Sequence, residues 1–467
     1  MSFCQKMKLN EAGITLIDCD HKTPPEQTSG YPYVGIPQLK DGHIRLDGAR
    51  LISEEDFILW TKKAKPKMND VILSRRCNPG ESAYVPESLE IALGQNLVLL
   101  RSDGSVIYPP FLRWLVQGNE WWEQVNKFLN VGAVFNSLKC KDIPNFKLTI
   151  PSLKEQREIT DILSSLDKKI ELNNKLNQTL ESMAQAIFKS WFIDFEPVRA
   201  KIAAKQAGQD PDLAAMCAIS GKSEAELEQM TKEDFAELQA TAALFPDELI
   251  ESELGEVPKG WEILDIDKTT SLIIDHRGKT PKKLGADWSD GGVIALSAKH
   301  IKDGCIVNRE QLRFVDTELY NKWMKEELKE GDILLTSEGP MGEMYYLAFD
   351  EKYCLSQRLY ALRANTDLVS SAFLYFWLLS PLAKSDMNGR ATGTTVVGIR
   401  QSELRKVRVL IPSKPICDLF NQKVKANLKR IALNNNELVN LAKIRDTLLP
   451  KLLSGELDVS DLQGEGV

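Results

Sequence analysis

The sequence predicts an α/β (α+β) fold with two similar globular domains and two long helices that pair as a coiled coil. Three observations lead to this prediction: an internal repeat, short apolar runs bounded by turn-forming residues, and two long stretches with an apolar seam. At 467 residues the chain is too long for one hydrophobic core. A unit of about 150 residues, present twice and joined by helices, accounts for this length.

The internal repeat is clearest in two pentapeptides, IELNN at 170–174 and IALNN at 431–435, which lie 261 positions apart. At the same offset, IPSLKEQREITDILSSLDKK matches IPSKPICDLFNQKVKANLKR. With the offset changed by one, MNDVILSRRCNPGESAY matches EGDILLTSEGPMGEMYY, and KTP occurs at equivalent places farther upstream. LGQNLVLLR also matches LSQRLYALR, which pairs Gln95 with Gln357 and Arg101 with Arg363, and the KTP match pairs Thr23 with Thr280. We therefore interpret the chain as two copies of one unit, an internal pseudo-two-fold repeat.

The two globular domains are expected at 1–150 and 258–411. Their runs VILS, NLVLL, DILLTS and RLYALR are bounded by Gly, Pro, Asn and Asp, which predicts strands joined by loops. The aromatic-rich runs PPFLRWLVQGNEWWEQVNKFL and SAFLYFWLLSPLAKSDM predict helices, the first opened by its two prolines. Strands and helices thus occur together in each domain.

A long helix is expected after each domain, at 151–196 and at 412–455. Ser152 and Ser413 are candidate N-caps, and a helix of about 39 residues would extend roughly 58 Å. Apolar residues recur at steps of three and four, so each helix has an apolar seam that its own small domain cannot cover. We expect the two helices to pack against each other and to hold the domains apart.

Asn173 and Asn434 fall on these two seams. A polar residue at such a position costs stability but fixes the register of the helices, because a shifted pairing leaves the amide buried without a partner. The alternative is a slightly shifted seam, with both amides facing water.

The composition is that of a globular protein, with no run of about 18 apolar residues and no signal peptide at the start, so a cytoplasmic location is expected. The cysteines are scattered and the four histidines lack ligand spacings, which argues against disulfides and metal sites. The segment 197–257 is predicted to be an acidic connecting insert, and 456–467 a C-terminal tail. Between residues 206 and 258 there are thirteen acidic residues against two lysines, which leaves the rest of the chain net positive.

Catalytic motifs are missing from the sequence. VIYPPFLRW carries Tyr108 where an amino-methyltransferase loop needs an amide or carboxylate, and RGKTP lacks the first glycine of a phosphate-binding loop. No Gly-x-Ser-x-Gly motif is present. We expect a non-catalytic DNA reader and scaffold. A self-contained DNA methyltransferase or nuclease is one alternative, and a pure coiled-coil assembly protein is another.

Several stretches together resemble one known family. They are IPSLKEQREITDILSSLDKKIELNN, SWFIDFEPVRAK, SELGEVPKGWE, GTTVVGIRQSELRKVRVLIPS and LLPKLLSGELDV, and the likeness covers essentially the whole chain. On these residues the chain resembles the specificity (S) subunits of type I restriction-modification enzymes, the HsdS family.

The resemblance implies two target-recognition domains, each binding one half of a split double-stranded DNA sequence. It also implies that the two helices form an antiparallel coiled coil that sets the gap between the half-sites. The implied partners are two modification (methyltransferase) subunits that methylate adenine, and restriction (translocase/nuclease) subunits. By this resemblance the chain binds no cofactor itself, and S-adenosylmethionine, ATP and Mg belong to the partner subunits.

The candidate DNA-binding residues lie in presumed loops of the two domains, where the copies diverge most. In the first domain they are Arg75, Arg76, Asn78, Asn136 and Lys139. In the second domain they are Lys299, His300, Ser337, Thr394, Thr395 and Arg400. The two threonines belong to the GTTVVGIR turn, whose hydroxyls and backbone amides suit a phosphate. The first copy has GAVFNSLK at this place, without the threonines.

Overall fold

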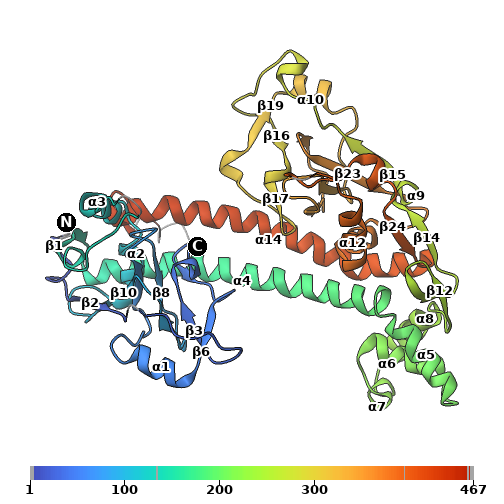
Figure 1. The fold of residues 1–467 in the computed structure, drawn as a ribbon, viewed down its shortest axis with the longest axis horizontal. Coiled ribbons are helices and arrows are strands. Elements are labelled where there is room, and N and C mark those ends of the chain that lie inside the picture. Colours follow the sequence, from blue (N-terminus) through green and yellow to red (C-terminus); the bar gives the residue numbers. More distant parts are fainter. Residues whose placement is uncertain (1–4, 21, 133–134, 394, 460–461, 463–467) are drawn as a thin grey trace. The chain divides into compact units, whose positions relative to one another are not determined.

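The computed structural model describes residues 5–20, 22–132, 135–393, 395–459 and 462, which form two compact units. The first unit contains Met1–Leu172 and Leu438–Val467, and the second contains Asn173–Glu437. The unit boundary therefore passes through both long helices. Each unit combines one globular domain with one half of each helix (Figure 1).

The first unit has a four-stranded antiparallel sheet in the order β2-β10-β7-β8 and a three-stranded sheet in the order β6-β3-β9. The strands are β1 (Gln5–Lys8), β2 (Ile14–Asp18), β3 (Tyr31–Val34), β4 (Leu39–Lys40), β5 (His43–Ile44), β6 (Arg50–Ile52), β7 (Val71–Ser74), β8 (Ser82–Tyr84), β9 (Ala92–Leu93), β10 (Leu97–Ser102) and β11 (Lys147–Ile150). The helices are α1 (Glu54–Thr61), α2 (Leu112–Leu115) and α3 (Asn119–Phe128).

The second unit repeats these two sheets in the orders β15-β23-β20-β21 and β19-β16-β22. Its strands are β14 (Glu262–Asp265), β15 (Thr270–Asp275), β16 (Val293–Leu296), β17 (Ile301–Lys302), β18 (Cys305–Ile306), β19 (Arg313–Val315), β20 (Ile333–Thr336), β21 (Met344–Tyr346), β22 (Tyr353–Leu355), β23 (Leu359–Ala364) and β24 (Arg408–Ile411). Its helices are α9 (Ile266–Thr269), α10 (Thr317–Trp323), α11 (Ser371–Leu379), α12 (Pro381–Arg390) and α13 (Gln401–Leu404). The pseudo-repeat of the sequence is thus a repeat of the fold.

The central sheets are buried on both faces, which explains the continuous apolar runs. In β7, Val71 and Leu73 belong to one core cluster, whereas Ile72 between them belongs to another. In β20 of the second unit, Ile333 and Leu335 likewise belong to one core cluster and Leu334 to another. Because successive side chains of a strand point to opposite faces, each run fills two cores at once. The strands predicted from VILS, NLVLL, DILLTS and RLYALR are confirmed.

The long helices are α4 (Leu153–Phe192) and α14 (Lys414–Ser454), with 40 and 41 residues. Ser152 caps α4: its backbone N–H donates to Glu155, and its hydroxyl accepts from the Glu155 N–H at 3.4 Å. Neither helix, nor any other in the described part of the chain, is long and apolar enough to cross a membrane.

The two long helices pack antiparallel. Residues with higher numbers in α4 contact residues with lower numbers in α14. In the second unit, Asn177 contacts Asn434, and farther along Phe188 packs on Phe420 at 5.6 Å between ring centroids. In the first unit, the end of α14 lies against the start of α4, where Arg445 binds Asp167. The predicted paired helices are confirmed.

Asn173 and Asn434 are both buried, each only 1% exposed. The Nδ2 of Asn173 donates to Glu437 at 2.8 Å, and the Nδ2 of Asn434 donates to Asn177 Oδ1 at 2.7 Å. The alternative in which both amides face water is therefore wrong. Their role in fixing the register stays a prediction.

The acidic insert consists of α5 (Glu196–Gln206), α6 (Pro211–Ser220), α7 (Glu224–Leu227) and α8 (Lys232–Ala243), followed by the hairpin β12 (Leu249–Ser252) and β13 (Gly255–Pro258). Ser223 caps α7 through a capping box with Glu226. A small core of Ala215, Met216, Leu227 and Ala242 holds α6 to α8 together. The insert is therefore a folded subdomain.

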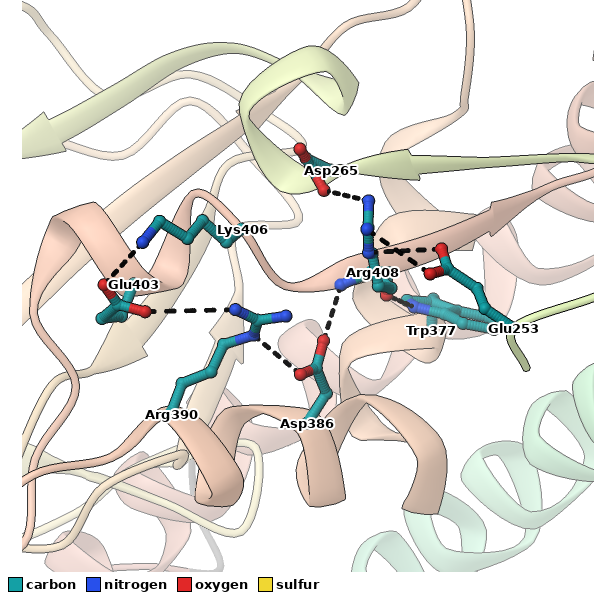
Figure 2. A network of polar contacts seen from close by, with 8 residues as sticks. All are labelled: Glu253, Asp265, Trp377, Asp386, Arg390, Glu403, Lys406 and Arg408. Atoms are coloured by element: carbon teal, nitrogen blue, oxygen red, sulfur yellow. Dashed lines mark hydrogen bonds and ion pairs between the residues drawn. The ribbon is translucent and has the colours of Figure 1, made fainter.

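Polar contacts of Arg408 join this hairpin to the second domain (Figure 2). The guanidinium of Arg408 binds Asp265 of β14 and Glu253 of the hairpin turn. The backbone N–H of Arg408 donates to Asp386 of α12, and its carbonyl accepts from the indole N–H of Trp377. Arg408 thus connects strand β24 to β14, to the hairpin and to helices α11 and α12.

Candidate nucleic-acid interface

A groove occurs at the same position of the repeat in both domains. The first groove, of about 800 Å³, is lined by Thr23, Tyr33, Gly35, Ile36, Pro37, Leu39, Lys40, Asp41, Cys77, Asn78, Glu81, Gly94 and Gln95. The second groove, of about 300 Å³, is lined by Thr280, Trp288, Ala295, Ser297, Ala298, Lys299, His300, Gln311, Arg313, Trp323, Gly339, Ser356, Gln357 and Arg358. The linings share equivalent positions, including Thr23 with Thr280 and Gln95 with Gln357.

The loops around the grooves have the same backbone conformation in both copies. Cys77 and Gly339 are both left-handed, with φ of 65° and 62°. Asn96 and Arg358 are also left-handed, with φ of 69° and 65°. A left-handed backbone is unfavourable for an arginine. Its occurrence at Arg358 indicates that the scaffold dictates the loop geometry and leaves the side chain variable.

Matching backbone hydrogen bonds lock one residue beside each groove. The backbone N–H of Arg75 donates to the carbonyl of Asn96 at 2.8 Å, and the carbonyl of Arg75 accepts the N–H of Leu138 at 2.9 Å. Ser337 makes the equivalent bonds with Arg358 and Ile399, both at 2.9 Å. Positions 75 and 337 are therefore equivalent framework positions of the two domains.

Two of the predicted DNA contacts are corrected by this geometry. Ser337 is 1% exposed, so its hydroxyl is closed to a partner outside the domain. His300 is 3% exposed and caps a 3₁₀ turn, because its Nδ1 accepts the N–H of Ser297 at 3.1 Å. Gln38 does the same for Gly35 at 3.0 Å in the first copy. Burial lowers the pKa of His300, so the ring is neutral at pH 7.

The second groove is lined by cations and amides. Three cations, Lys299, Arg313 and Arg358, line it, and no carboxylate is among the described residues of its lining. Lys299 donates to Gln311 at 3.0 Å, and Arg358 pairs with Glu338 outside the lining at 2.9 Å. An exposed, positively charged groove with amide and aromatic walls suits an electron-rich, hydrogen-bond-accepting ligand.

The first groove has a different chemistry at the same position. It carries one cation, Lys40, beside the carboxylates Asp41 and Glu81. Its side-chain amides are bonded to other side chains of the protein: Gln95 donates to the Thr23 hydroxyl at 3.0 Å, and Asn78 donates to Glu81 at 3.1 Å. In the part of the chain that the structure describes, no group of three or more His, Cys, Asp and Glu is placed to hold a metal ion.

The other predicted residues lie on the loops that flank the grooves. Loops 130–137 and 392–398 are each closed by paired backbone bonds, and each bridges to the residue just before Cys77 or Gly339. Exposed residues on or next to these loops and on the neighbouring turn are Arg76, Asn78, Asn136, Lys139, Thr395 and Arg400. Arg75 is half-buried, with an Nη2 3.9 Å from Asp18. Thr394 lies outside the described residues.

The residues that the sequence analysis did not single out are mainly those on the groove walls. They include Gln95, Gln357, Gln311, Arg313, Arg358, Trp288 and Trp323. The repeat did pair Gln95 with Gln357 and Thr23 with Thr280, and that pairing is the signal that leads to the grooves. Arg313 and Trp288 lie in stretches that the repeat did not match.

Comparison with known proteins decides the family. The model of the type I restriction modification DNA specificity domain matches residues 18–182 and again residues 258–443. The chain belongs to the family of type I restriction-modification specificity subunits. Its two copies of the specificity domain correspond to the two halves of the structural repeat.

Similarity to individual proteins agrees with this. The chain is 31% identical over 408 residues to the type I restriction enzyme HindI specificity subunit of Haemophilus influenzae, which covers 84% of this chain and 87% of that protein. It is 24% identical to the MjaIX specificity subunit of Methanocaldococcus jannaschii, over 94% of this chain and 87% of that protein. The crystal structure of a type I S subunit from M. genitalium has the same fold, with a TM-score of 0.56, 14% identity and 96% of each chain covered.

Proposed function

We propose that this specificity subunit binds an asymmetric, bipartite double-stranded DNA site, with one half-site read by each domain. The single observation that carries the proposal is the pair of grooves: they occupy one position of a shared scaffold but differ in charge and hydrogen-bonding groups. A common scaffold with unlike linings suits two readers of different base sequences. Two tandem readers in one chain would contact DNA at two separated places.

The partners in this proposal are two adenine methyltransferase subunits and the restriction subunits. Relatives of the chain are named as specificity subunits of type I restriction enzymes, which supports such an assembly. The two halves of the repeat share one fold, so each would offer a similar scaffold to one copy of the same partner. S-adenosylmethionine, ATP and Mg are assigned to those partner subunits.

The test is to map methylated adenines in cells that express the chain with its methyltransferase subunits, and to repeat the mapping after exchanging one domain. We expect one asymmetric sequence with two specified halves. Replacing residues 258–411 with the corresponding domain of a relative should change one half and leave the other unchanged. Methylation without sequence preference, or a change in both halves, would refute the proposal. Methyl transfer by the purified chain alone would favour the self-contained methyltransferase instead.

A further inference from the structure

Arg313 stands out among the residues of the second groove because it has no fixed partner for its charge. It lies on β19, directly across the sheet from Ala295 of β16. Its guanidinium sits over the ring of Trp288, 5.2 Å from the centroid. Among the residues that the structure describes, no carboxylate pairs with it. An arginine stacked on an aromatic face keeps its in-plane N–H groups available for a planar acceptor.

The equivalent arginine of the first domain is held differently. Arg50 lies on β6, across from Tyr33 of β3, in the register that Arg313 has with Ala295. Its Nη1 donates to the carbonyl of Pro24 at 3.1 Å, and its Nη2 lies 3.9 Å from Glu26. Arg50 is not part of the first groove's lining. The same position thus carries an arginine engaged by the protein in one copy and an arginine open to the groove in the other.

The rest of the second groove also lacks strong acceptors. Its other charged members are Lys299 and Arg358, and its lining has no carboxylate in the described residues. Trp323 and His300 also belong to the lining, but the Nε1 of Trp323 and the Nε2 of His300 are buried. Because Nδ1 of His300 accepts a hydrogen bond, Nε2 carries the proton and is a donor. What the wall presents to an occupant of the groove is therefore the positive charge of Lys299, Arg313 and Arg358.

We propose that Arg313 is a specificity-determining residue of the second domain and reads a guanine in its half-site. Guanine presents two acceptors, O6 and N7, on its major-groove edge, and a planar guanidinium donates to both at once. Adenine and cytosine present an amino group there, which cannot accept a hydrogen bond from the guanidinium. Trp288 positions the guanidinium. The inference rests on the proposed function, because it assumes that the second domain reads DNA.

The experiment uses the full chain in complex with its methyltransferase subunits. The preferred site is first selected from random DNA, and the second half-site is identified by the exchange of residues 258–411. Binding of every single-base variant of that half is then measured for the unmodified chain and for Arg313→Ala, Arg313→Lys and Arg50→Ala. The melting temperature of each variant is measured as a control for folding, which the exposed Arg313 should not affect.

We expect one G·C pair at which the unmodified chain discriminates roughly 5- to 150-fold against other pairs. Both Arg313→Ala and Arg313→Lys should reduce that discrimination to near one, because lysine cannot make the bidentate contact. Arg50→Ala, the matched variant in the first domain, should leave it intact.

Three results would overturn the inference. A uniform loss of affinity for all sequences, with a shallower salt dependence and recovery in Arg313→Lys, would mean a phosphate contact. Unchanged discrimination in Arg313→Ala, or a second half-site without a specified guanine, would mean that Arg313 reads no base. A complex that selects no sequence at all refutes the proposed function itself, and this outcome is visible in the unmodified chain before any variant is compared.

Discussion

At the scale of single residues, the two domains repeat one buried ion pair as closely as their strands. Arg101 binds both carboxylate oxygens of Asp70, and Arg363 binds both of Asp332, with distances between 2.6 and 2.9 Å. Both carboxylates are buried, and each also accepts a backbone N–H three residues upstream. The hydrogen bond with the carboxylate raises the pKa of each arginine. These residues are the same in both copies because they hold the scaffold.

Replacing Asp332 with alanine should destabilise the second unit by about 3 kcal/mol, because Arg363 and the Lys329 N–H lose their buried partner. Two measurements report the loss of stability: denaturant unfolding of the full chain, and hydrogen exchange of the backbone amides in β20 and β23. Lys352→Ala is the control, since its pair with Glu327 is more than half exposed and contributes less than about 1 kcal/mol. Equal effects of the two changes would contradict this account.

Only some of the predicted contact residues lie at the grooves with accessible side chains, for a physical reason. Asn78 and Lys299 do line the grooves, because loops after buried strands carry exposed polar side chains. Ser337 and His300 also follow buried strands, but their side chains point into the domain. The direction of a loop side chain depends on tertiary hydrogen bonds, such as that between Ser297 and His300, which no local pattern contains.

At the scale of elements, equivalent places on the long helices are filled by different chemistry. In the first unit, Asp167 of α4 is buried and binds Arg113 of α2, Arg445 of α14 and His43 of β5. In the second unit, the repeat places Leu428 at the position of Asp167 and Tyr375 at that of Arg113. One helix contact is therefore electrostatic and its counterpart is apolar. The sequence repeat predicted the helices, but it did not predict this exchange.

The charged contact gives the first unit a stability that depends on pH. Burial alone would raise the pKa of Asp167, but His43, Arg113 and Arg445 outweigh it and lower the pKa to about 2. A carboxyl whose pKa is lower in the folded state stabilises the fold above its ordinary pKa near 4 and loses that contribution as the pH falls towards 2.

Lowering the pH from 5 to 2 should therefore remove about 2 kcal/mol of stability through Asp167. Hydrogen exchange over the first half of α4, measured across this range, reports the change. In Asp167→Asn, the first unit should be less stable at pH 5 and should depend less on pH below it. Asp161→Asn is the control, because Asp161 is exposed on the same helix as Asp167. A pH profile unchanged by Asp167→Asn would contradict the prediction.

At the scale of the whole molecule, each compact unit contains the first half of its own domain's helix and the second half of the other. Ile159 and Leu163 of α4 share a core with Leu449 and Leu452 of α14 in the first unit. The apolar seams predicted that the helices pair, but both halves of each seam look alike in sequence. Which helix halves belong to the same unit depends on the antiparallel pairing. The pattern of apolar residues does not distinguish this pairing from a parallel one.

The unit boundary falls between Leu172 and Asn173 in α4, and between Glu437 and Leu438 in α14. Inserting one heptad at both boundaries preserves the apolar seam and leaves each unit's own contacts unchanged. Seven residues add about 10.5 Å of helix, close to the rise of three base pairs at about 3.4 Å each. We expect both half-sites to be retained and the spacer between them to lengthen by about three base pairs. Methylation mapping of the variant measures the spacer directly. A heptad inserted in α4 alone shifts the register of the antiparallel pair and should abolish methylation. An unchanged spacer in the double insertion would show that the helices do not set the gap between the half-sites.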